Sequence, residues 1–135
     1  MQLTSLRLHR VSLPLVTPFE TSFARQTEKH CYLVEASFDT EAGPVIGWGE
    51  SVAMISPLYS DEYVDGGIAV TRDWMAPILF DVENLTAETI AWHLKPIIGH
   101  PMAKSALEMA VLEAAMADPD QADRMDEIIT RYGEV

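Results

Sequence analysis

Cysteine is nearly absent from this sequence of 135 residues, which contains only Cys31. A single cysteine excludes an internal disulfide, and no CxxC pair or Cys/His zinc cluster is present. The sequence therefore fits a reducing, cytoplasmic setting. Long apolar runs are missing too, since no stretch approaches the roughly 18 apolar residues of a membrane span. The N-terminal segment alternates instead of forming a solid apolar block, which argues against a secretory signal. We expect no membrane association.

Basic residues are also scarce. Nine Lys and Arg stand against 21 Asp and Glu, so the formal net charge is −12. A chain this acidic repels a phosphate backbone, and we expect no nucleic-acid partner. The excess of carboxylates favours solubility and carries no information about the fold.

Motifs of catalysis are missing as well. The four histidines show neither HxH nor HExxH spacing, no serine stands in GxSxG, and no glycine-rich phosphate loop follows a strand. Glu50 with a histidine is the one arrangement from which a small enzyme could be built; a carboxylate bonded by loop amides is the simpler interpretation. Glu108 and Glu113 lie off the apolar side of a predicted helix and are expected to be solvated.

What is present begins with strands. Apolar residues at positions 6 and 8 share one parity and those at 11, 13 and 15 the other, which predicts a bulge near His9–Arg10 or a strand that switches faces. Pro14 and Pro18 are expected to end this strand, leaving a loop over Pro18–Lys29. Alternation over residues 31–38 and 45–51 predicts two more strands and hence an antiparallel meander. Gly47 and Gly49 in the third strand allow a close backbone approach or a bulge.

The second half predicts helices. Ser60 is a candidate N-cap for a helix reaching residue 80, Thr86 caps residues 87–98 before Gly99, and Pro101 opens a helix over 101–117. A short acidic helix around Met125–Tyr132 follows. The 101–117 helix has the clearest periodicity, and its alanines predict close packing. Its apolar stripe comprises Ala103, Ala106, Leu107, Ala110, Val111 and Ala114. The fold class is thus α+β, a three-stranded antiparallel meander followed by about three helices.

Two predicted loops are unusually apolar. Phe19–Thr27 and Ser51–Tyr59 each follow a strand of the same small sheet, and both are rich in Phe, Met, Leu and Tyr. Surface connections are normally polar. Side by side, the two loops would form an apolar rim of the kind that lines small-molecule sites. The alternative is a satellite hydrophobic cluster packed beneath long loops.

Three blocks of the sequence carry a family resemblance: LHRVSLPLVTPFETSFARQT, GWGESVAMISPLYSDEYVDG and GHPMAKSALEMAVLEA. Together they resemble the N-terminal capping domain of the enolase superfamily. The most similar group is the muconate-lactonising-enzyme branch that contains o-succinylbenzoate synthase and N-acylamino acid racemase. The resemblance covers residues 1–115 in order, and Glu113 stands where the last block has an aspartate.

The resemblance implies a capping domain whose two mobile loops close over the mouth of a (β/α)₈ barrel. On that basis Phe19, Ser22 and Phe23 belong to the first loop and Met54 and Tyr59 to the second, where they would contact the non-reacting part of a small carboxylate substrate and exclude water. Members of the family abstract a proton alpha to a carboxylate with barrel lysines and a Mg²⁺ ion held by three Asp/Glu side chains. The reaction is a dehydration in menaquinone biosynthesis or a racemisation of N-acylamino acids.

The barrel itself is absent from this sequence. Such a barrel takes about 250 residues, and no KxK motif occurs. We therefore interpret residues 1–115 as the capping domain and residues 116–135 as a divergent acidic tail, as truncation, a shifted reading frame or a fragment of a longer gene would produce. The chain alone is expected to be inactive and to bind no Mg²⁺. The alternative is a stand-alone binding module that self-associates, as a homo-oligomer, through the helical face that normally meets the barrel.

Overall fold

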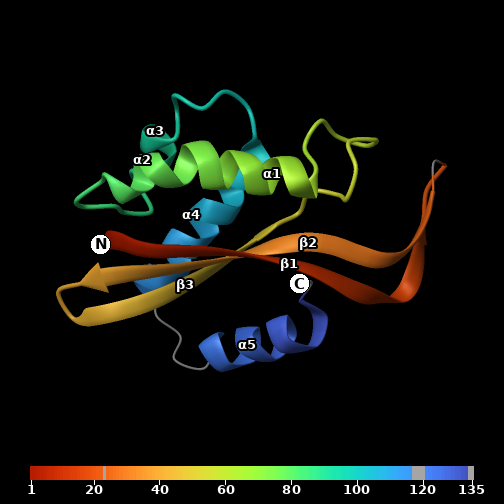
Figure 1. Ribbon diagram of the computed structural model, residues 1–135, viewed down its shortest axis with the longest axis horizontal. Coiled ribbons are helices and arrows are strands. Elements are labelled where there is room, and N and C mark those ends of the chain that lie inside the picture. The colour runs from red at the N-terminus through yellow and green to blue at the C-terminus, as the bar shows by residue number, and fades with distance from the viewer. Residues whose placement is uncertain (23, 117–120, 134–135) are drawn as a thin grey trace.

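The computed structural model describes residues 1–22, 24–116 and 121–133. Three antiparallel strands form one sheet in the order β1-β2-β3 (Figure 1). They span Gln2–Glu20, Arg25–Thr40 and Gly43–Ser51. The predicted meander and the α+β class are confirmed. Within the described residues no helix is long and apolar enough to cross a membrane.

The first hairpin is much longer than the sequence indicated. The predicted loop over Pro18–Lys29 is wrong for most of its length, because β1 continues to Glu20 and β2 begins at Arg25. The two arms pair through Phe19 and Gln26 beyond an irregularity after Pro14. Both prolines are tolerated because β1 is an edge strand, where a missing N–H leaves no ladder bond unmade.

The change of parity in β1 has a simple structural cause. Of the two alternatives predicted near His9–Arg10, a bulge or a switch of faces, the bulge is wrong, since pairing with β2 runs unbroken through these residues and the register shifts lie at Leu3/Ser5 and Pro14/Phe19. Instead, the side chains at 6 and 8 pack against the main core and those at 11 and 13 against a second cluster. The strand is therefore covered on one face first and on the opposite face later.

Helices α1 to α4 cover one face of the sheet (Figure 1). Their bounds are α1 Val64–Val70, the π-helical turn η1 Thr71–Met75, α2 Ala76–Phe80, α3 Ile90–His93 and α4 Pro101–Met116. Between sheet and helices lies the main core, whose largest fully buried side chains include Tyr32, Phe38, Met75 and Leu79. Burial of this apolar surface is the main stabilising term of the fold.

Helix α1 starts later than predicted. Its N-cap is Tyr63, so the prediction for Ser60 is wrong. The Ser60 hydroxyl accepts a hydrogen bond from the Glu62 N–H at 3.1 Å. The carboxylate of Glu62, only 5% exposed, accepts bonds from the backbone N–H groups of Met102 and Ala103. Glu62, which lies just before α1 in the sequence, therefore caps the N-terminus of α4.

Helix α3 is only four residues long, although a helix over 87–98 was predicted. The N-cap of α3 is Thr89, which makes no side-chain cap bond, so the prediction for Thr86 is wrong. The hydroxyls of Thr86 and Thr89 instead accept bonds from each other's backbone N–H, both at 3.2 Å, in the turn before the helix. Pro96 cannot continue the helix. Gly99, with φ of +71°, then turns the chain toward α4.

Helix α4 matches its prediction. All six residues of the apolar stripe are buried. The helix lies directly on β3, and a Cβ added at Gly47 or Gly49 would stand 1.9 Å from the carbonyl oxygen of Ala110 or Ala106. The close approach expected from these glycines is therefore present. Glu113 is not simply solvated, contrary to prediction, because its carboxylate accepts a 2.8 Å bond from the Trp48 N–H at the free edge of β3.

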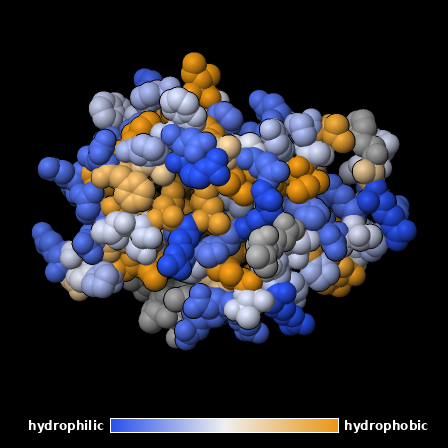
Figure 2. Space-filling view, in the orientation of Figure 1, coloured by the Kyte–Doolittle hydropathy of each residue, from blue (hydrophilic) through white to orange (hydrophobic). Residues whose placement is uncertain are grey.

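Helix α5, Gln121–Tyr132, lies alone on the opposite face of the sheet (Figure 1). It begins earlier than the predicted Met125–Tyr132 helix. Its apolar side chains pack against a second cluster built around buried Val11, Cys31 and Leu33. The face of the molecule seen in Figure 2 is mostly hydrophilic, with hydrophobic side chains in separate groups.

Burial beneath α5 raises the pKa of the Cys31 thiol from 9.0 to about 11. In the unfolded chain the Cys31 thiol deprotonates near pH 9, whereas in the folded chain it stays protonated up to about pH 11. Its contribution to the free energy of unfolding is therefore fully present below pH 9 and is lost as the pH rises toward 11. We expect a loss of about 2 kcal/mol across this window. Urea unfolding at pH 8.5 and 10.5 measures it. Cys31→Ala should lose less stability between these two pH values than the unmodified chain. Tyr32, whose pKa burial also raises, titrates in both proteins and contributes equally to both. An equal loss of stability in the two proteins would therefore contradict the assignment to Cys31.

Candidate functional site

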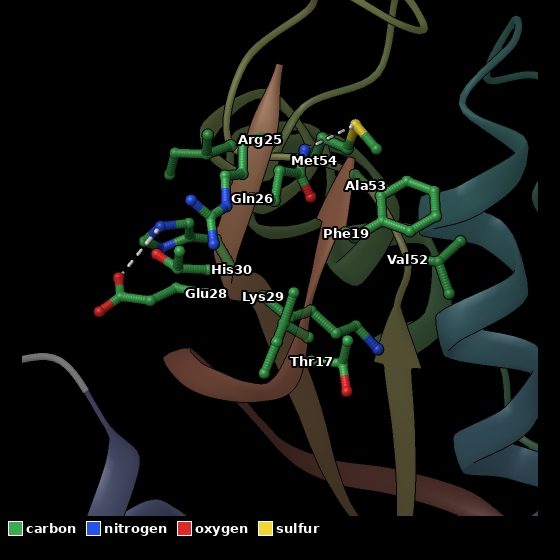
Figure 3. A pocket seen from close by; sticks show the side chains of 13 residues that line it. Thr17, Phe19, Arg25, Gln26, Glu28, Lys29, His30, Val52, Ala53 and Met54 are labelled. Carbon is green, nitrogen blue, oxygen red and sulfur yellow. Dashed lines mark hydrogen bonds and ion pairs between the residues drawn. The ribbon is translucent and has the colours of Figure 1, made fainter. Parts of the chain in front are cut away.

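A cavity of about 580 Å³ opens at the far end of the sheet, where the β1–β2 hairpin extends past β3 (Figure 3). Its walls come from both arms of the hairpin and from the loop that follows β3. The lining residues are Leu15, Thr17, Phe19, Arg25, Gln26, Thr27, Glu28, Lys29, His30, Val52, Ala53, Met54 and Ile55. Six of these residues are apolar and seven are polar or charged, so the cavity offers a ligand both apolar contact and polar partners.

The register of the sheet creates this cavity. Pairing between β2 and β3 ends at Tyr32 and Ser51, whereas β1 and β2 stay paired as far as Glu20. Beyond that point the hairpin has one uncovered side. The loop after β3 is held beside it by a parallel bridge between Met54 and Tyr63, and the Val64 N–H donates to the Met54 carbonyl at 2.8 Å. The second wall is therefore anchored to the start of α1.

Two side-chain contacts join the walls directly. The Gln26 amide lies 3.7 Å from the Met54 sulfur, as the dashed line in Figure 3 marks. The Lys29 ammonium contacts the Glu50 carboxylate at the point where β3 leaves the sheet. The hydrogen bond and charge of Glu50 raise the pKa of Lys29, opposed by partial burial. Both Lys29 and Glu50 remain partly exposed, so the pair is screened and its contribution to stability is small.

The structure brings together two of the residues that the family resemblance indicates. Phe19 and Met54 line the same cavity, one from each wall. Ser22 lies exposed at the hairpin turn, and Tyr59 is 75% exposed and outside the cavity lining. Phe23 is outside the described residues. The cavity also contains polar residues of β2 to which the family resemblance gave no role, above all Gln26 and Lys29.

The charged groups at this site form ion pairs. Glu50 contacts Lys29, whereas His9 bonds Glu35 at 3.1 Å. Over residues 1–22, 24–116 and 121–133 no group of three His, Cys, Asp or Glu side chains is arranged to hold a metal ion. The cavity can bind and shield a ligand, and its lining includes the titratable pair Glu28 and His30, whose Oε2 and Nε2 atoms lie 3.7 Å apart.

No protein-family model matches the chain. Individual proteins do. N-succinylamino acid racemase of Amycolatopsis is 47% identical over 116 residues, which are 86% of this chain and 30% of that protein. o-Succinylbenzoate synthase of Geobacillus stearothermophilus is 35% identical over 104 residues, 77% of this chain and 27% of that protein.

Solved structures agree with these relatives. A member of the enolase superfamily from Listeria innocua superposes with a TM-score of 0.76 at 32% identity, over 85% of this chain and 30% of that one. N-succinyl Arg/Lys racemase of Bacillus cereus gives 0.70 at 27% identity, over 82% of this chain and 29% of that one. The chain belongs to the enolase superfamily.

Within the superfamily it corresponds to the N-terminal capping domain of the o-succinylbenzoate synthase and N-succinylamino acid racemase group. The predicted assignment is confirmed. The chain spans about 30% of the length of the curated relatives it matches. The stand-alone interaction module is not favoured, because the match to these enzymes covers most of the chain.

Proposed function

We propose that this chain is the substrate-capping part of an enzyme that abstracts a proton alpha to a carboxylate, as an o-succinylbenzoate synthase or an N-acylamino acid racemase. The observation that carries the proposal is the cavity itself. Phe19 from the hairpin and Met54 from the loop after β3 form its two walls, and these are the segments that the family resemblance assigns to the lid. We place the capping domain at residues 1–115 and the divergent tail at 116–135, and the enzyme in the cytoplasm.

The contribution of these residues is binding and exclusion of water. Apolar side chains on both walls would cover the non-reacting part of a small carboxylate substrate, which fixes its orientation and lowers the local dielectric constant. In the relatives' reaction Mg²⁺ stabilises the negative charge that develops on the substrate carboxylate. The described residues of this chain do not fit such an ion, so the metal ligands and the acid–base lysines would come from a barrel.

The test replaces the matching N-terminal segment of the Amycolatopsis racemase with residues 1–116 of this chain. We expect the chimera to racemise N-succinylamino acids and the 135-residue chain alone to show no turnover with Mg²⁺. In the chimera, Phe19→Ala and Met54→Ala should each reduce kcat/KM about tenfold, the effect of removing apolar contacts worth 1–3 kcal/mol.

Phe80→Ala is the matched control, because Phe80 is a partly exposed phenylalanine on α2, away from the cavity lining. It should leave kcat/KM within about twofold of the unmodified chimera, as expected for a side chain without substrate contact. Equal losses in all three variants would show a general loss of stability and contradict the capping role. A folded but inactive chimera would do the same.

A further inference from the structure

We propose that Lys29 makes the capping cavity selective for acyl groups that end in a carboxylate, such as a succinyl group. This inference rests on the capping function proposed above and adds a specificity-determining residue to it. The resemblance assigned only apolar and hydroxyl side chains to the lid. The cavity, in contrast, contains a cation whose position is set by the sheet.

The place of Lys29 in the cavity is the first observation. Its side chain leaves the β2 arm where β2 still pairs with β1, so its stem begins on regular strand backbone. In Figure 3 the Lys29 side chain points to the side of the hairpin on which Phe19 and Val52 lie. Arg25 lies on the other side. Lys29 is therefore the cation that lies on the same side of the cavity as its apolar residues Phe19 and Val52.

The ion pair with Glu50 holds the Lys29 ammonium in place and uses only part of its hydrogen-bonding capacity. An ammonium group has three N–H donors, and Glu50 contacts it through Oε1. Donors remain for a second carboxylate, and the side chain is 43% exposed, so a ligand can reach it. The Glu50 carboxylate also raises the pKa of Lys29, which keeps the group charged at neutral pH. A fixed, charged and accessible donor is what binding of an anionic group requires.

The arrangement specifies the shape of the ligand. Phe19, Val52 and Met54 suit a short apolar spacer, and the ammonium beside them suits an anion at its end. A succinyl group has this form, with two methylenes between the amide carbonyl and a terminal carboxylate. A butyryl group fills similar space but ends in a methyl group, which leaves the ammonium with water as its only new partner.

The experiment titrates the ¹⁵N,¹³C-labelled 135-residue chain with N-succinyl-L-phenylalanine and with N-butyryl-L-phenylalanine and follows both by NMR. We expect the succinyl compound to bind about three- to tenfold more tightly, as for one partly screened charge contact. It should also shift the Cε–Hε signal of Lys29. Only two other lysines exist, and Lys95, exposed on the turn after α3, serves as an internal control that should not move.

Lys29→Met should abolish the preference for the succinyl compound without weakening binding of the butyryl compound, and Lys29→Arg should restore it. If the Lys29→Met variant does not fold, the shift of the Lys29 signal in the unmodified chain still tests whether Lys29 contacts the succinyl compound. Equal affinities for both compounds, with shifts at Phe19 and Met54, would overturn the role of Lys29 and leave the capping function standing. No shift at any cavity residue with either compound would also overturn the role of Lys29, whereas the capping function is tested separately by the racemase chimera.

Discussion

Gly49→Ala is expected to destabilise this protein by about 3 kcal/mol or more, the upper range for overpacking a tight core. The added Cβ would lie 1.9 Å from the Ala106 carbonyl oxygen and 2.9 Å from its carbonyl carbon. These atoms belong to the backbone of α4, so no side-chain rotation can relieve the contact. The whole helix must move away from β3, and the buried stripe that follows Ala106 must lose contacts with it. Urea unfolding monitored by circular dichroism measures the change.

Gly66→Ala is the matched control. Gly66 lies within α1, where an added Cβ would come within 2.8 Å of the Tyr63 ring. That ring is 37% exposed and free to shift. Replacing a helical glycine by alanine gains up to about 1 kcal/mol of helix propensity. The two substitutions should therefore act in opposite directions, and a similar loss at both positions would contradict the packing argument.

Glu62→Ala is the second substitution with a large expected effect, a loss of about 2–4 kcal/mol for removing a buried charged acceptor. The Glu62 carboxylate accepts bonds of 2.9 and 3.1 Å from Met102 and of 3.2 Å from Ala103. Without it two N–H groups in the first turn of α4 have no acceptor, and the favourable interaction of the carboxylate with the helix dipole is lost. The loss should appear as a lower urea midpoint with an unchanged m-value.

Glu62→Gln separates the two contributions, because an amide keeps one oxygen acceptor and removes the charge. We expect it to lie between Glu62→Ala and the unmodified chain. The control is Glu83→Ala, an exposed carboxylate that should change stability by no more than about 0.5 kcal/mol. If Glu62→Ala costs no more than Glu83→Ala, the carboxylate does not cap α4.

The sequence predicted α4 and its close packing correctly because both follow from local spacing. Six apolar residues at helical intervals define one face, and small residues on that face leave room for a close neighbour. Gly47 and Gly49, two apart on one strand, supply the complementary surface. Where a pattern repeats within one element, periodicity alone is sufficient.

The hairpin and the caps could not be predicted in this way. Pro14 and Pro18 indicate a strand end unless the strand is known to lie at the edge of the sheet, which is a property of the assembled sheet. The role of Glu62 depends on the N-terminus of α4, 40 residues further along the chain. Lys29 and Gln26 lie in a regular strand, and their position in a cavity follows from where β3 stops pairing.

The sequence by itself determined the class of the fold, helix α4 with its buried face, the two apolar segments and the family to which they belong. Each of these is set by composition and by spacing within a short stretch. Tertiary structure decided which face of β1 is covered, which helix Glu62 caps, and that Phe19, Met54 and Lys29 share one cavity. These contacts join residues far apart along the chain, and only the register of the strands and the docking of the helices bring them together.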